Sequence, residues 1–282
     1  MDARMAELIA DCSIEVAPRD PYAGEALREL FGVGTTVFVN HPGSVAYQDV
    51  VLACTRLRRA GFVVVPHIAA RRLTGFTQAA DFVRRLADVG VNEVLLLGGD
   101  AKPFGPFNSA LDLLATGVLE RQGIPAVAFA GYPEGHPHID EAVLASALRA
   151  KLELARERGI TTSLVTQFAF EAEPVRRWIA REREAGIECP IRVGVAGPAS
   201  VATLAKYAVR CGVGASLRAL ARGHTAIVRV LAEASPDALI EALVADGAMR
   251  IDGLHVFTFG GVQRTAAWRE RALMRRPRRL MG

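Results

Sequence analysis

Side chains capable of acid–base chemistry stand within or directly after several apolar stretches of this 282-residue chain. Glu15 lies inside SIEVAP, His67 follows a proline in FVVVPHIA, and Asp100 follows EVLLLGG. The stretch AFAGYPEGHP adds Tyr132 and His136 after another apolar run. An ordinary turn after a strand is usually built from Gly, Asn, Asp and Ser. Tyr132, Glu134 and His136 in this stretch are therefore candidates for function, and Glu15, His67 and Asp100 are candidates because of their places within or after apolar runs.

Glu15 differs from the other candidates because Ile14 and Val16 flank it within an apolar run. An ionised carboxylate in such a place costs on the order of several kcal/mol if it is unpaired. We therefore expect Glu15 to be paired, protonated or functional. Desolvation favours the protonated form, which suits a general acid. An internal ion pair with an arginine is the structural alternative.

The other candidates each have an ordinary structural interpretation beside the functional one. His67 is equally consistent with a hydrogen-bonded core histidine, Asp100 with a residue that stabilises a turn, and Gln167 with a cap on a neighbouring backbone group. Gly98 and Gly99 precede Asp100 and leave no side chain between backbone and ligand. A flat ring or a phosphate can approach such a backbone closely.

Eight short apolar stretches alternate with segments of helical periodicity. Because these stretches are nearly continuously apolar, they are typical of parallel strands covered on both faces. Many of the helical segments end near a glycine. The stretches span residues 13–18, 36–41, 62–69, 93–99, 126–132, 163–169, 192–197 and 253–259. The pattern predicts an α/β fold, a closed (β/α)8 TIM barrel, and no GxGxxG follows the first strand to favour the open doubly wound alternative.

The connection between the seventh and eighth strands is longer than one helix requires. It predicts extra helices over 200–212, 216–234 and 236–247, the last one beginning at Ser235–Pro236. We see no linker or low-complexity tract, so we expect one catalytic domain over residues 1–282. In a (β/α)8 barrel the strand ends gather at one rim, so the polar residues that end the strands are expected to face one site.

Composition excludes several classes of protein. The chain is 51% hydrophobic and 23% charged, as in ordinary soluble globular proteins. Its apolar runs are shorter than the roughly 18 residues that span a bilayer, and its start lacks a signal peptide, which predicts a cytoplasmic protein without membrane contact. Four scattered cysteines predict small buried hydrophobes, with no metal site or disulfide framework. The basic tail over 269–282 is interpreted as a solvated end, without a nucleic-acid partner.

The chain resembles the methylenetetrahydrofolate reductase family of one-carbon metabolism over nearly its whole length. The resemblance depends on SIEVAP, PHIAA, LLLGGDA, AGYPEGHP and SLVTQF, in this order on successive strands. It implies an oxidoreductase that holds FAD, takes hydride from NAD(P)H and passes it to 5,10-methylenetetrahydrofolate in a ping-pong cycle. The sequence does not decide between this direction and the reverse reaction, the oxidation of 5-methyltetrahydrofolate. It also does not decide between NADH and NADPH as the nicotinamide.

The resemblance also implies roles for individual residues. It places the catalytic acid on Glu15. It places on Asp100 the family's aspartate that lies beside the flavin pyrimidine and also contacts the folate. Gln167 and Tyr207 are implied substrate contacts, to the pterin and to a substrate ring. The implied flavin contacts are His67, Gly98, Gly99, Asp100, Tyr132 and His136, with Lys151 as the lysine for the ribityl or phosphate chain.

This chain departs from the family pattern at three places. EVAP replaces the bulkier aromatic residues after the first-strand glutamate, and Gly98 stands where many members carry an arginine. The stretch HVFTFGG lacks the asparagine of the family's last strand. These differences predict a divergent branch and bear on flavin affinity and on the choice of nicotinamide.

Four alternatives remain open from the sequence. A flavin-independent reductase could use the same barrel, and a non-catalytic folate- or flavin-binding partner of a methyltransferase system could keep the fold. A phosphate-binding lyase or aldolase would usually use a strand-end lysine or a metal carboxylate cluster, and the sequence shows neither clearly. A homo-oligomer is also open, because the apolar stripe over 51–57 fits an interface as well as core packing.

Overall fold

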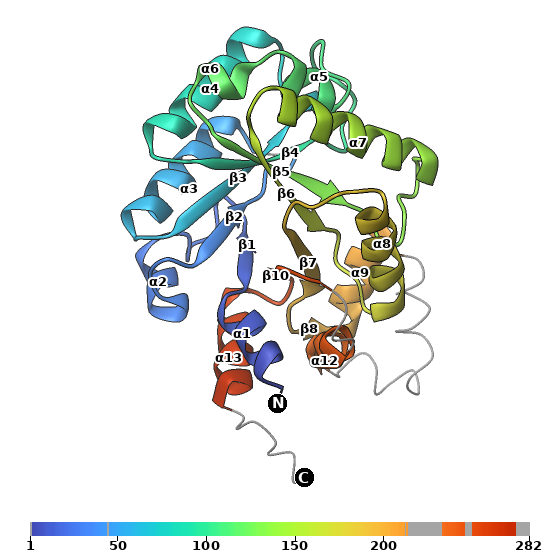
Figure 1. Ribbon diagram of the computed structural model, residues 1–282. Coiled ribbons are helices and arrows are strands. Elements are labelled where there is room, and N and C mark those ends of the chain that lie inside the picture. Colours follow the sequence, from blue (N-terminus) through green and yellow to red (C-terminus); the bar gives the residue numbers. More distant parts are fainter. Residues whose placement is uncertain (1, 44, 212, 214–232, 246–249, 275–282) are drawn as a thin grey trace. The chain divides into compact units, whose positions relative to one another are not determined.

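The computed structural model describes residues 2–43, 45–211, 213, 233–245 and 250–274 (Figure 1). In this part of the chain, eight strands form a closed barrel in the order β1–β10–β7–β6–β5–β4–β3–β2. Strands β2 to β5 pair in parallel, as do β7 and β10. The strands are β1 (Ser13–Val16), β2 (Thr36–Val39), β3 (Val63–Ala69), β4 (Glu93–Leu97), β5 (Ala126–Gly131), β6 (Thr161–Thr166), β7 (Ile191–Ala196) and β10 (Gly253–Phe257). The predicted (β/α)8 fold is confirmed.

Helices follow the strands, as the periodicity predicts. They are α1 (Ala3–Ala10), α2 (Glu25–Phe31), α3 (Tyr47–Arg59), α4 (Phe76–Asp88), α5 (Ala110–Ala115), α6 (Val118–Arg121), α7 (Glu141–Glu157), α8 (Ala172–Glu184), α9 (Val201–Cys211), α12 (Asp237–Ala245) and α13 (Val262–Met274), with a short 3-10 turn, η1 (Ala70–Arg72). No helix in the described ranges is both long and apolar enough to cross a membrane.

The chain divides into two compact units. Unit 1 comprises Met1–Ile14, Gly131–Glu141 and Val165–Gly282, and unit 2 comprises Glu15–Ala130 and Ala142–Leu164. The prediction of one domain over residues 1–282 stays a prediction.

In unit 2, the helices α3 and α4 lie along the strands β2 to β4 (Figure 1). Every residue of β3 except Val63 is buried, which accounts for its continuous apolar sequence. Helix α4 buries Ala79, Phe82, Val83 and Leu86, the three-and-four spacing of one helix face. Within the stripe over 51–57, Leu52 is 54% exposed, whereas Ala53, Cys54 and Leu57 are in the core. Core packing therefore explains most of that stripe.

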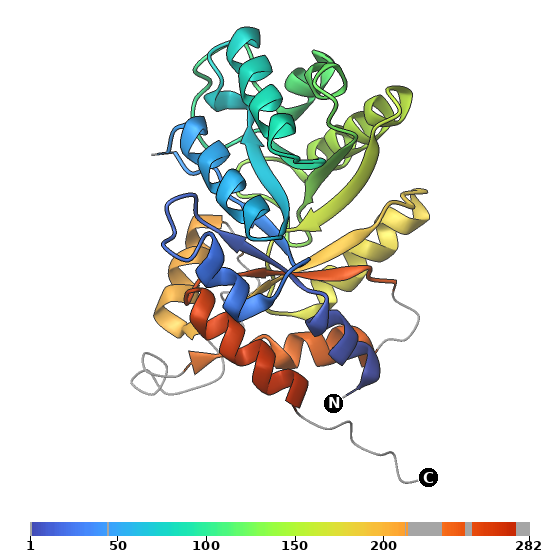
Figure 2. The same ribbon diagram turned by 90° about the vertical axis from the view of Figure 1, so that its left-hand side faces the viewer.

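In unit 1, helix α1 packs against α12 and α13, and Figure 2 shows α1 beside α13. Arg269 of α13 donates hydrogen bonds to the carbonyl oxygens of Ile9 and Ala10, at 3.3 and 2.6 Å. These bonds satisfy carbonyl groups that the end of α1 leaves without intrahelical partners. The hydroxyl of Ser13 lies 3.0 Å from Nδ1 of His255, and both side chains are buried. These contacts thus join α1 and β1 to α13 and β10, the first and last elements of the chain.

The connection between β7 and β10 contains two of the predicted helices, α9 and α12, and α12 begins directly after Ser235–Pro236. The third predicted helix, 216–234, lies mostly outside the described residues. Its last two residues are not helical, because β9 (Glu233–Ala234) pairs antiparallel with β8 (Ala199–Ser200). The prediction was wrong there, since a two-residue strand formed by long-range pairing leaves no local pattern.

Two of the four cysteines, Cys12 and Cys54, are buried as expected, whereas Cys189 and Cys211 are half-buried. Burial raises the pKa of the Cys12 thiol to about 11. A thiol that stays protonated is a poor nucleophile. Cys12 is therefore a packing residue of the core.

Candidate active site

The carboxyl group of Glu15 lies among polar side chains of the next two strands of unit 2. Nδ2 of Asn40 donates a hydrogen bond to Oε1 of Glu15 at 3.1 Å. Nε2 of His67 lies 3.4 Å from Oε2 of Glu15, and these two side chains are only 10% and 15% exposed. Two contacts of Glu15 are thus with an amide and an imidazole.

Strand register explains why these three residues meet. The N–H of Asn40 donates to the carbonyl oxygen of Val16 at 3.1 Å, which places Asn40 beside the end of β1. Val39 pairs with Pro66 across β2 and β3, so Asn40 and His67 are the next residues on their strands. Asn40 directly follows β2, and its hydrogen bond makes it a candidate for orienting the carboxyl group of Glu15.

His41, the residue after Asn40, is buried against the ring of Phe82, with the ring centroids 5.7 Å apart. Burial, together with the smaller effects of the positive charges of Arg72 and His67, lowers the pKa of His41 to about 4. His41 is therefore neutral near neutral pH. It is a packing residue and a poor proton donor.

The Gly98–Asp100 segment follows β4. Gly99 has a φ of +94°, in the left-handed region, and a Cβ there would lie 3.2 Å from Cβ of Ala69. Glycine is therefore favoured at this position. A Cβ on Gly98 would meet no atom within 4 Å, so open space faces that residue. The side chain of Asp100 is exposed. The segment has room for a ligand to approach its backbone.

Lys151 of α7 lies over β5. Its Nζ is 5.0 Å from the centroid of the Phe129 ring, a cation–π contact. Burial lowers the pKa of Lys151 to about 8. Among the described residues Lys151 forms no ion pair, so its charge is balanced by no carboxylate there.

In unit 1, Tyr132 and His136 belong to one tight loop. The N–H of Gly135 donates to the carbonyl oxygen of Tyr132 at 3.0 Å, and Gly135 has a φ of +80°. Pro133 and Gly135 thus occupy positions that favour a turn. The rings of Tyr132 and His136 meet edge to face, 5.4 Å between centroids. Nδ1 of His136 accepts the N–H of His138 at 3.2 Å, so the neutral ring carries its proton on Nε2.

Gln167 is held at the end of β6 by backbone bonds. Its N–H donates to the carbonyl oxygen of Gly131 at 2.8 Å, which links it to the residue before Tyr132. Oε1 of Gln167 accepts the N–H of Phe168 at 3.2 Å, so the side-chain amide nitrogen is the group that can donate to a ligand. The buried hydroxyl of Thr166 donates to the carbonyl oxygen of Gln167 and accepts the N–H of Gly194.

Tyr207 of α9 belongs to an aromatic cluster at the ends of β6 and β10. Its ring stacks on Phe259, with centroids 4.0 Å apart and planes at 15°. Phe259 in turn stacks on Phe257 at 5.5 Å, and its ring meets Phe168 edge to face. One face of Tyr207 is therefore covered by protein, and a substrate ring would have to use the other.

Sequence reasoning missed residues that act through packing. Gly131 lies under Trp178 of α8, and a Cβ on Gly131 would be 2.5 Å from the indole ring. A glycine before Tyr132 was the available signal, since glycine within a strand marks a close approach. Phe259, which stacks on Tyr207, had no local signal in the sequence.

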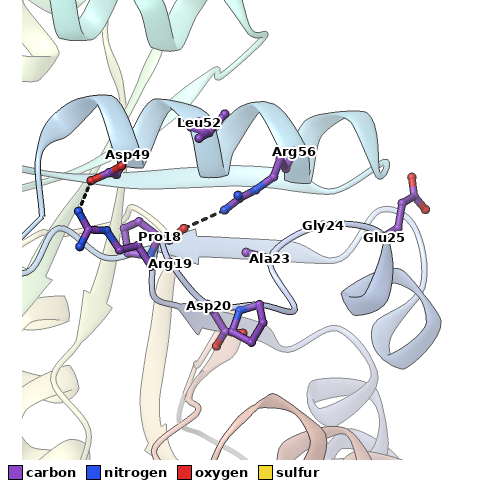
Figure 3. Close-up of a pocket in the computed structure, with 10 residues that line it drawn as sticks. Pro18, Arg19, Asp20, Ala23, Gly24, Glu25, Asp49, Leu52 and Arg56 are labelled. Carbon is purple, nitrogen blue, oxygen red and sulfur yellow. Dashed lines mark hydrogen bonds and ion pairs between the residues drawn. The ribbon is translucent and has the colours of Figure 1, made fainter.

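A pocket of about 430 Å³ lies in unit 2, beside the connection that follows β1 (Figure 3). Arg19 pairs with Asp49 at 2.8 Å, and Arg56 donates to the carbonyl oxygen of Pro18 at 2.9 Å. These contacts hold the connection against α3. The pocket contains none of the predicted site residues, so we assign it no part in the chemistry.

The strands thus form a closed (β/α)8 barrel with a largely buried glutamate on the first strand. The family model described as methylenetetrahydrofolate reductase matches residues 26–265. The chain therefore belongs to the methylenetetrahydrofolate reductase family. Among solved structures, it is similar to dihydropteroate synthase (FolP) from Thermus thermophilus, at 15% identity, with 93% of this chain and 90% of that chain covered and a TM-score of 0.49.

Proposed function

We propose that the protein is a flavin-dependent oxidoreductase that interconverts 5,10-methylenetetrahydrofolate and 5-methyltetrahydrofolate with NAD(P)H by ping-pong hydride transfer. Membership of the family supports a folate-related oxidoreductase. The observation that carries the proposal is the Glu15 carboxyl group, largely buried and in contact with Asn40 and His67. A proton donor of this kind is what the folate reaction requires.

Glu15 is the proposed acid. The five-membered ring of 5,10-methylenetetrahydrofolate opens to an iminium only when a ring nitrogen leaves, and an acid must protonate that nitrogen. Asn40 holds Oε1, so Oε2 is the oxygen that carries the proton. Nε2 of His67 lies 3.4 Å from Oε2, so the imidazole faces the oxygen that we assign to proton donation.

The residues present fit a flavin. Open space at Gly98 and the left-handed backbone of Gly99 leave room for a flat ring beside the segment. We assign flavin binding to His67, Gly98, Gly99, Asp100, Tyr132, His136 and Lys151. When bound, FAD would supply a two-electron carrier between NAD(P)H and the folate. Nδ1 of His136 accepts the N–H of His138, so Nε2 is the nitrogen that we assign to the flavin.

Gln167 and Tyr207 are the proposed substrate contacts. The fixed Oε1 of Gln167 leaves its amide nitrogen to donate to an acceptor on the pterin. Tyr207, supported from behind by Phe259, offers one face to a substrate ring. A cytoplasmic location stays a prediction.

The visible absorption spectrum of the purified protein tests the proposal, followed by addition of 5-methyltetrahydrofolate without oxygen. We expect a flavin band that bleaches on addition. A colourless protein would favour direct hydride transfer from nicotinamide or a binding role. A flavin band that does not bleach would indicate a flavoprotein with another substrate.

A further inference from the structure

We infer that Arg71 is a positioning residue for Asp100, an inference that rests on the proposed function. Asp100 lies in the connection between β4 and α5, residues 98–109, which contains no helix or strand of its own. Backbone hydrogen bonds of regular structure therefore do not fix its conformation. Contacts from the neighbouring connection must do so.

Arg71, in the turn after β3, holds this connection at four points. Its N–H donates to the carbonyl oxygen of Gly98 at 3.0 Å, and its carbonyl oxygen accepts the N–H of Phe104 at 2.8 Å. The guanidinium donates from Nη1 to the carbonyl oxygen of Gly99 at 3.1 Å and from Nε to that of Asn108 at 2.7 Å. One residue thus spans the connection from its start to its end.

Only the guanidinium bonds depend on the identity of the side chain. They join Gly99, next to Asp100, to Asn108 near the start of α5, so the side chain closes the connection into a loop. The far end is fixed independently, because Ser109 and Asp112 form a capping box at α5. A Cβ on Gly105 would lie 2.5 Å from the carbonyl oxygen of Leu73, so the middle of the connection also packs closely against the backbone that follows η1. The Gly98–Asp100 end has Arg71 as its side-chain anchor.

The charge of Arg71 strengthens this assignment. Within the described residues Arg71 forms no ion pair, and its hydrogen bonds go to backbone carbonyl groups. Hydrogen bonds from a charged donor are stronger than neutral ones. Asp100 is only one residue beyond Gly99, so a shift of Gly99 shifts the Asp100 carboxylate. A displacement of about 1 Å can lower a rate on the order of a hundredfold.

A double-mutant cycle between Arg71→Met and Asp100→Asn tests the inference by folate kcat/KM. We expect Arg71→Met alone to lower kcat/KM by about tenfold or more, and to add little in the Asp100→Asn background, because residues that act as a unit are not additive. Arg71→Lys, which keeps one charged donor, should recover part of the loss. Hydrogen exchange should rise at amides 99–104 in Arg71→Met.

Arg72→Met is the matched control, because Arg72 stands in the same turn but donates to the carbonyl oxygen of Val45, in another connection. It should leave exchange at 99–104 unchanged. Arg71→Met activity within about twofold of wild type, or losses that multiply fully with Asp100→Asn, would overturn the inference. A wild-type protein without folate activity would instead contradict the proposed function, while the exchange comparison would still report on the loop.

Discussion

Nε2 of His67 lies 3.4 Å from Oε2 of Glu15, and both side chains are largely shielded from water. An imidazole and a carboxyl group at this distance influence each other's protonation strongly. The second oxygen of Glu15 is already engaged by Asn40. The proposed acid function of Glu15 would therefore depend on Asn40 and His67 as well, and each residue can be tested alone.

Replacement of Asn40 by leucine should impair catalysis without loss of the bound flavin. Leucine is similar in size but cannot donate to Oε1, so the Glu15 carboxyl group would lose its fixed orientation. We expect kcat with folate to fall by about ten- to a hundredfold, measured by steady-state assay with flavin content determined from absorbance. Asn40→Gln serves as the conservative comparison. A leucine variant with wild-type kcat would show that Asn40 does not orient the acid.

Stability should fall in acid because His41 is buried in its neutral form. The pKa of His41 is lowered from 6.5 to about 4, so its contribution is complete above pH 6.5 and is lost as the pH falls toward 4. The full difference corresponds to roughly 3 kcal/mol. His41→Leu should show a flatter fall in Tm between pH 6.5 and pH 4 than wild type. Parallel curves for the two proteins would remove His41 as the cause.

Lys151→Met should raise stability and weaken flavin binding. Burial lowers the pKa of Lys151 from 10.5 to about 8, so the protonated amine destabilises the fold fully below pH 8 and not above pH 10.5. The penalty is at most roughly 3 kcal/mol, and the contact with Phe129 offsets part of it. The variant should therefore unfold at higher Tm than wild type at pH 7, by a margin that shrinks toward pH 10.

Flavin affinity separates the two roles of Lys151. If the ammonium serves the phosphate chain, the apoprotein variant should bind FAD about tenfold more weakly in a fluorescence titration. Equal affinity would leave Lys151 as a packing residue and withdraw its assignment to the cofactor.

Gly131→Ala should disturb Tyr132 and Gln167, whereas Gly98→Ala should be tolerated. An added methyl group at Gly131 would lie 2.5 Å from Trp178, while one at Gly98 would meet nothing within 4 Å. We expect a loss of about 1–3 kcal/mol for Gly131→Ala, measured by denaturant unfolding. A second substitution, Trp178→Leu, should lessen the effect of the alanine. Equal stability of the two single variants would contradict the packing described here.

The strands could be predicted because each is a short, continuously apolar stretch. The contact of Glu15 with Asn40 and His67 could not, since it depends on strand register and on side-chain geometry. Trp178 and Gly131 are far apart in sequence, so their contact has no local pattern. Arg71 resembles an ordinary surface cation, because its partners are backbone carbonyl groups, which every residue has. Sequence thus points to candidate chemical residues, whereas the contacts that hold them are visible only in the structure.

The most direct test of the account compares two half-reactions of Glu15→Gln without oxygen. Glutamine keeps the size of the side chain but cannot donate the carboxyl proton. We predict that NAD(P)H bleaches the flavin of the variant at close to the wild-type rate, while turnover with the folate falls by about three orders of magnitude or more. Normal folate turnover in this variant would contradict the assignment of Glu15 as the acid.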